Sequence, residues 1–150
     1  MLEMKLNPKV VHNVIDLLAA AIHIDRNLMD MMDRLDEDFA EISTLTMQIF
    51  KQLSRNKHSL NDKVSTGKEV PSEDVINHLE KFTLHNKQME LQADAHESQL
   101  QRLCTCCEHC SAFYEAIVET AVDETVALFA QELAASTLDR VKILKLALAR

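Results

Sequence analysis

The feature that most constrains the fold of this chain is its shortage of residues that make turns. Only one Gly and two Pro occur in 150 residues, and aromatic residues make up 4%. This leaves little material for the turns of a sandwich or barrel, or for a glycine-rich phosphate loop. Hydrophobic residues still make up 47% of the chain, which is enough for a sizeable core. The sequence therefore predicts a single all-α domain that spans residues 1–150.

The charge balance of the chain is acidic. The 24 Asp and Glu outnumber the 16 Lys and Arg, which gives a formal net charge of -8. This balance disfavours nucleic acid or an anionic membrane as a partner. The longest nearly apolar run, residues 14–24, is interrupted by Asp16 and His23 and has about half the length of a membrane-spanning helix. We therefore expect this run to form a core helix. The first residues do not have the pattern of a signal peptide, which predicts a cytoplasmic protein.

The first half of the chain has a helical rhythm that begins near residue 8. Asn7 before Pro8 predicts an N-cap followed by the first residue of a helix. Apolar residues then recur at steps of three and four, at Val14, Leu18, Ala21, Leu28, Met32, Leu35, Phe39, Ile42, Ile49, Leu53 and Leu60. One unbroken helix would have about 57 residues and extend some 85 Å, which is too long for a compact domain of this size. We therefore prefer a turn at residues 36–38, and a continuous helix with a solvated acidic face is the alternative.

The second half begins after the one clear linker, residues 65–71, which holds the only Gly and the second Pro. Ser72 is predicted to cap the next helix, and polar residues favour a break near residues 90–98. Beyond the break, the pattern predicts a helical hairpin with arms at about residues 99–121 and 123–149. Asp123 is the predicted N-cap of its second arm, and Val122 is the first residue of that arm's apolar stripe.

The hairpin contains an aromatic pair, an acidic turn and an apolar pattern in that order. They comprise Phe113, Tyr114, Ala121, Asp123, Glu124, Val126, Leu128, Phe129, Leu133 and Ala134. With these residues, the stretch at about residues 99–149 resembles the second hairpin of rubrerythrin-like members of the ferritin-like superfamily. The resemblance implies an antiparallel four-helix bundle with a long connection between helices 2 and 3. In this chain the connection would be residues 65–97, with an extra helical segment between residues 72 and 97.

The metal ligands that the resemblance implies are replaced in this chain. The family holds two iron or manganese ions with inward carboxylates and Glu-x-x-His pairs. Cys107 occupies the position of an inward Glu, seven residues before Tyr114, while Thr137 and Arg140 occupy the Glu and His positions of the last helix. Residues 53–60, in the second helix, offer one His and two cations where a Glu-x-x-His is needed. We therefore expect no ferroxidase or peroxidase activity and no cofactor.

The four cysteines form a second candidate site. Cys104, Cys107 and Cys110 are three residues apart, so they form a slanting row on one helix face, with Cys106 to one side. Their clustering suits free thiols in a reducing compartment, and we interpret the row as buried packing. Two alternatives are a soft-metal or thiol-sensing site, with His109 as a further candidate ligand, and an intermolecular disulfide.

The other candidate positions have a packing or surface interpretation. Met29, Met31 and Met32 are interpreted as core filling, with Asp30 and Asp33 on the wet face.

Two groups of histidines complete the candidates. His78 and His85 lie on one side of a helix beside Lys81 and are interpreted as solvated surface. His23 and Asp25 lie where the first helix of the resembled family carries ligands, and a satisfied His at the edge of the core is preferred there.

The leading functional prediction is a metal-free helical bundle that acts through contacts with a protein partner or as a homodimer. This prediction rests on two points. The resemblance implies the scaffold, and the metal ligands expected on that scaffold are replaced. The alternatives are a residual iron or manganese protein and a soft-metal or thiol-sensing protein built on the cysteine cluster. No catalytic constellation is recognisable, so we lean against an enzyme.

Overall fold

A computed structural model describes residues 5–35, 40–67, 69–91 and 99–149 of the chain. These residues form helices and no strand, so the predicted all-α class is confirmed. The elements are the short 3-10 helix η1 (Pro8–Val10) and the α-helices α1 (Val14–Met32), α2 (Ala40–Gly67), α3 (Glu73–Leu91), α4 (Gln99–Thr120) and α5 (Glu124–Leu148).

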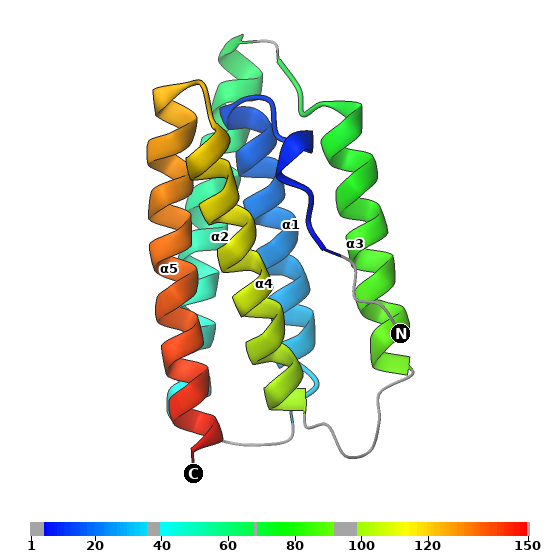
Figure 1. The fold of residues 1–150 in the computed structure, drawn as a ribbon, viewed down its shortest axis with the longest axis vertical. Helices are drawn as coiled ribbons and strands as arrows, with labels where there is room; N and C mark the ends of the chain where they lie inside the picture. The colour runs from blue at the N-terminus through cyan, green and yellow to red at the C-terminus, as the bar shows by residue number, and fades with distance from the viewer. Residues whose placement is uncertain (1–4, 36–39, 68, 92–98, 150) are drawn as a thin grey trace.

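Four of the helices, α1, α2, α4 and α5, lie side by side, and α3 lies on the outside of α1 (Figure 1). The most extensive contacts join α4 to α5 and α1 to α2, and α2 also packs against α5. Within each pair the helices are antiparallel, whereas α2 and α4 run in the same direction. The chain therefore has to return along the length of the molecule between them, and α3 makes this return.

The first α-helix begins later than the sequence predicts. The Asn7 side chain accepts a hydrogen bond from the Lys9 backbone N–H at 3.0 Å, but it caps only η1. The chain is extended at Val11, and α1 starts at Val14 with Asn13 as its cap, whose side chain accepts from the Asp16 N–H at 2.9 Å. The predicted start at Pro8 is wrong because a second cap residue, Asn13, lies six positions after Asn7 and competes for the same helix.

The first half of the chain forms two α-helices rather than one. α1 ends at Met32 and α2 begins at Ala40, so the single continuous helix is excluded. The turn predicted at residues 36–38 lies outside the described residues. α2 continues to Gly67 and so includes the first three residues of the predicted linker, which is a correction. In the last turn of α2 the Thr66 hydroxyl donates back to the Asp62 carbonyl at 2.8 Å.

The second half agrees more closely with its prediction. Ser72 precedes α3, and its hydroxyl accepts from the Val75 N–H at 3.3 Å. The predicted hairpin is confirmed as α4 and α5, and Asp123 caps α5 by accepting from the Thr125 N–H at 2.7 Å. Val122 is fully exposed rather than part of the apolar stripe, because it lies in the turn before α5. The break predicted near residues 90–98 falls largely outside the described residues.

The core receives buried apolar side chains from all five α-helices. The run at residues 14–24 lies within α1 and is mostly buried, as expected for a core helix. Across the described residues, no helix combines the length and apolar character that crossing a membrane would require.

Candidate functional site

The most unusual feature of the core is a buried ion pair between α5 and α1. Arg140 and Asp25 are 1% and 2% exposed, and they are 115 residues apart in the chain. Arg140 Nη1 donates to Asp25 Oδ1 at 2.7 Å, and Nη2 donates to Oδ2 at 3.4 Å. This two-pronged geometry is the one in which a guanidinium binds a carboxylate most specifically.

A third helix adds a partner for the guanidinium. Gln52 on α2 accepts a hydrogen bond from Arg140 Nη2 through its side-chain oxygen. The buried Thr137, one turn before Arg140 on α5, donates to the Leu133 carbonyl at 2.7 Å and so has its partner within its own helix. Two buried donors, Nε of Arg140 itself and Nδ2 of Asn56 on α2, have no hydrogen-bond partner within the described residues. Through Gln52, the ion pair of α5 and α1 is also linked to α2.

Burial and mutual attraction both shift the pKa values of Asp25 and Arg140. Burial raises the pKa of the Asp25 carboxyl, although the Arg140 charge and hydrogen bond oppose that rise. Burial disfavours the charge on Arg140, but the charge and hydrogen bond of Asp25 outweigh it and raise the pKa of the guanidinium. Each group therefore depends on the other to remain charged in the core.

The cysteine row lies on the core face of α4, as predicted. Cys104, Cys107 and Cys110 are buried, Cys106 is half-buried, and all four thiols are free. Burial raises the pKa of Cys104 and Cys107, whereas for Cys110 the hydrogen bond with Cys106 is the first cause and burial the second. A raised pKa keeps a thiol protonated, and the thiolate is the reactive form.

Two residues of α4 bring this helix to the ion pair. The charges of Arg140 and Asp25 act on both Cys107 and Tyr114, and burial is the main cause that raises the pKa of each. Tyr114 is 2% exposed, and its ring lies 5.4 Å from that of Phe113. All four packed helices thus contribute polar side chains to one cluster, in which Gln52 is half-buried and the other members are buried. We call it the central polar cluster: Asp25, Gln52, Cys107, Tyr114 and Arg140.

The resemblance implies that Asp25, Cys107 and Arg140 occupy ligand positions of one metal site, but it does not predict the ion pair. No signal in the sequence indicates Gln52. A usable signal was present, because Asp25 and Arg140 each fall on the apolar face of a helix. Opposite charges on two core-facing stripes are expected to find each other, since an unpaired buried charge is costly.

The candidate metal ligands lie on α4. His109 is half-buried there, between the buried Cys107 and Cys110. Cys104 Sγ donates to Glu108 Oε1 at 3.7 Å. Over the ranges that the structure describes, no three His, Cys, Asp or Glu side chains are grouped closely enough to hold a metal ion.

The remaining candidates are distributed between core and surface. Met32 is buried while Asp30 and Asp33 are exposed, which agrees with the core-filling interpretation. His78 is half-buried, and its Nε2 accepts from the Asn7 N–H at 2.9 Å, so the interpretation as solvated surface is wrong for this residue. It was wrong because the N-terminal segment covers that part of α3.

His23 borders a groove of about 350 Å³ between α1 and α3. Burial is the main cause that lowers its pKa. At this groove the Asn27 side-chain nitrogen donates to the His23 carbonyl at 2.7 Å and to Thr83 Oγ1 at 3.0 Å, and its oxygen accepts from Asn86 at 3.3 Å. The buried amide is therefore already bonded to the protein.

The chain matches no protein-family model, no curated protein sequence and no solved structure.

Proposed function

We propose that this chain is a metal-free protein with a ferritin-like or related antiparallel four-helix bundle, which acts through contacts with another protein or a second copy of itself. The observation that most supports the metal-free centre is the buried pair of Arg140 and Asp25. Arg140 stands where the resemblance implies a His ligand, and a guanidinium does not ligate metal ions. The pair supplies an internal cation, so the buried carboxylate has no need of a metal.

The order of the helices supports the same proposal. In a ferritin-like bundle one long crossover connects two helices that run in the same direction. α2 and α4 run in the same direction here, and α3 lies on the connection between them (Figure 1). We further propose that the protein is cytoplasmic.

Elemental analysis and mass measurement test this proposal together. Protein purified without chelators or added metal should contain iron, manganese, zinc and copper far below one ion per chain. Light scattering on a size-exclusion column should give twice the mass of one chain at tens of micromolar. Stoichiometric metal would contradict the metal-free centre, and a monomer at that concentration would contradict the homodimer.

A matched pair of variants links the metal content to the ion pair. Arg140→His restores the residue type that the resemblance implies at this position, while Arg140→Lys keeps a cation. If Arg140 replaces a ligand, neither variant gains a full metal site, because Cys107 and Thr137 are also substituted. Loading of iron or manganese by the natural chain itself would instead favour the residual-metal alternative.

The thiol alternative is supported by one observation. Cys106 is half-buried, so it is more exposed than the three buried thiols beside it. The raised pKa of the other three thiols opposes a sensing role, because a sensor needs a thiolate. Rapid native-state oxidation of Cys106 together with Cys110 at neutral pH would support the alternative.

A further inference from the structure

The N-terminal residues 5–11, which we call the strap, cross the side of the molecule between α3 and α4 (Figure 1). η1, within the strap, contacts both of these helices. Leu6 is 8% exposed and belongs to the apolar core, and Val10 and Val11 pack against that core. The strap therefore covers apolar surface that would otherwise face water.

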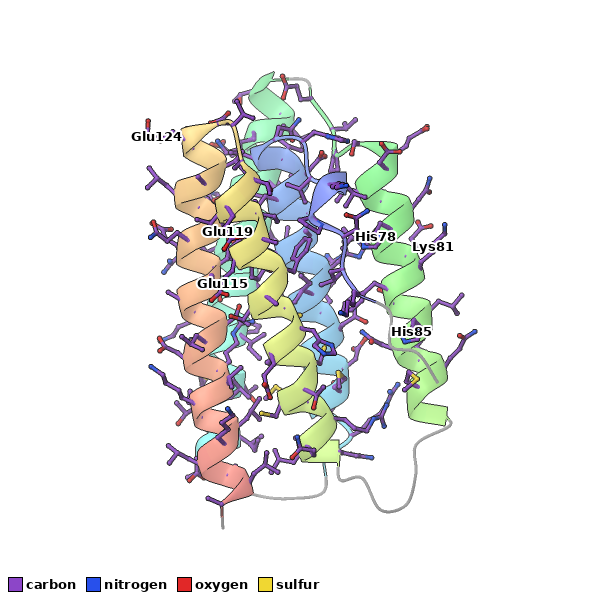
Figure 2. All side chains as sticks on the ribbon, viewed as in Figure 1. His78, Lys81, His85, Glu115, Glu119 and Glu124 are labelled. Atoms are coloured by element: carbon purple, nitrogen blue, oxygen red, sulfur yellow. The ribbon has the colours of Figure 1, made fainter. Side chains whose placement is uncertain are left out.

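One hydrogen bond fastens the strap to α3. The backbone N–H of Asn7 donates to Nε2 of His78 at 2.9 Å. Figure 2 shows His78 on the side of α3 that faces the N-terminal segment. A backbone N–H can only donate, so Nε2 has to accept, and the imidazole has to be neutral with its hydrogen on Nδ1. Protonation would place a second donor opposite the first and replace this attraction with repulsion.

We propose that the strap is a pH-sensitive device: it is held against α3 while His78 is neutral and is released when His78 takes up a proton. The other end remains attached, because the backbone N–H of His12 donates to Asp16 Oδ2 on α1 at 2.9 Å. Release therefore pivots near His12 and uncovers Leu6 together with the surface beneath it. This device does not depend on the function proposed above.

The electrostatic surroundings favour the neutral form of His78. Burial lowers its pKa, and the charge of Lys81 one turn away lowers it further. Lys81 is the one charged group among the described residues that contributes to this shift, and the strap itself adds the exposed cations Lys5 and Lys9. The held state binds fewer protons than the released state, so it is favoured above about pH 6.5, the ordinary imidazole value, and weakens below it.

A second histidine, His12, lies next to the strap. His12 Nε2 lies 3.5 Å from Asp74 Oδ2 on α3, and these side chains are 52% and 75% exposed. Exposed pairs of this kind contribute little, so a substitution of His12 serves as the control for His78.

Backbone relaxation of the full ¹⁵N-labelled chain at pH 7.5 and 5.0 tests the proposal. We expect order parameters of residues 5–11 to fall from about 0.85 to below about 0.6 at the lower pH, while those of α4 and α5 stay high. His78→Gln offers an acceptor that does not titrate, so its strap should remain ordered at both values. His12→Gln is the matched control and should still release its strap at low pH.

Several results would overturn the proposal. These are an ordered strap at pH 5.0 in the natural chain, equal release in His78→Gln, loss of the response in His12→Gln, or simultaneous unfolding of α4 and α5. The ¹⁵N shifts of the His78 ring in the natural chain give an independent check that does not require a folded variant. They should show an unprotonated Nε2 at pH 7.5, and a hydrogen on that atom would rule the device out.

Discussion

At the scale of single residues, the central polar cluster has a distinct energetic character. A buried ion pair adds little net stability compared with apolar residues of the same size, because both charges lose their hydration. Removing one partner is far more costly, since the other charge is left unpaired in the core. Arg140 and Asp25 therefore specify how α5 and α1 meet more than they stabilise the fold.

This asymmetry can be measured with a double-mutant cycle. Asp25→Leu and Arg140→Met should each lower the free energy of unfolding by about 3 to 5 kcal/mol, because each leaves one charge without its partner. The double variant Asp25→Leu/Arg140→Met should lose much less than the sum of the single losses. Urea denaturation measures all three, and single losses below about 1 kcal/mol would show that the pair is not closed in solution.

The accessibility of the thiols provides a second test at this scale. Cys106 should react first with iodoacetamide under native conditions, while Cys104, Cys107 and Cys110 resist, because they are buried and protonated. Cys107→Ser should cost roughly 1 to 3 kcal/mol if the hydroxyl finds no partner. Peptide mass spectrometry identifies the labelled residue. Fast labelling of Cys107 with an unchanged melting temperature for the Ser variant would overturn its assignment to packing.

At the scale of elements, Asp16 connects the beginnings of two helices that are distant in the chain. Its carboxylate accepts from the His12 N–H at 2.9 Å, from the Ser72 N–H at 2.8 Å and from the Ser72 hydroxyl at 3.1 Å. Asp16 is fully buried, in the first turn of α1, whereas Ser72 immediately precedes α3. One side chain thus holds the start of α3 against α1.

Removal of this carboxylate should loosen α3 in particular. Asp16→Ala leaves three donors without an acceptor and should lower the free energy of unfolding by about 2 to 3 kcal/mol. Amide exchange at Ser72 and in the first turn of α3 should become faster. Asp123→Ala, which removes an exposed cap in the hairpin, is the control and should cost about 1 kcal/mol without affecting α3. Equal effects of the two variants on α3 would refute this role of Asp16.

At the scale of the whole molecule, the buried thiols should make the fold sensitive to alkali. The pKa of Cys107 and Cys110 is raised in the folded state, so the folded chain retains protons that the unfolded chain releases near pH 9. Their stabilising contribution is complete below that pH and declines as the pH rises. Acidic and neutral conditions leave these thiols unchanged.

The expected loss is large enough to measure by denaturation. Between pH 7.5 and 9.5, with reductant present, the free energy of unfolding should fall by about 1 to 2 kcal/mol from these two thiols. The double variant Cys107→Ala/Cys110→Ala should lose most of this dependence, because it has no titrating group at either position. A natural chain whose stability is flat over this range would show that the thiols are not sequestered.

Local features of the sequence determined the helical class, the hairpin of α4 and α5, the caps at Ser72 and Asp123, and the core-facing row of cysteines. Caps and periodicity act over a few residues, so one sequence is sufficient to find them. Even so, the competing cap at Asn13 displaced the predicted start of α1, because two adequate caps differ by less free energy than the packing around them.

The central polar cluster and the strap were decided only by the tertiary structure. Nothing in the spacing of Asp25 and Arg140 indicates that they touch, because their 115-residue separation is bridged by the packing of whole helices. His78 likewise acquires its partner from Asn7, 71 residues away, because the N-terminal segment lies beside α3. Periodicity shows which face of a helix is buried, but which buried side chains meet depends on the relative placement of the helices. The attraction between two charges weakens with distance, so it becomes strong only once the packed helices bring them close together.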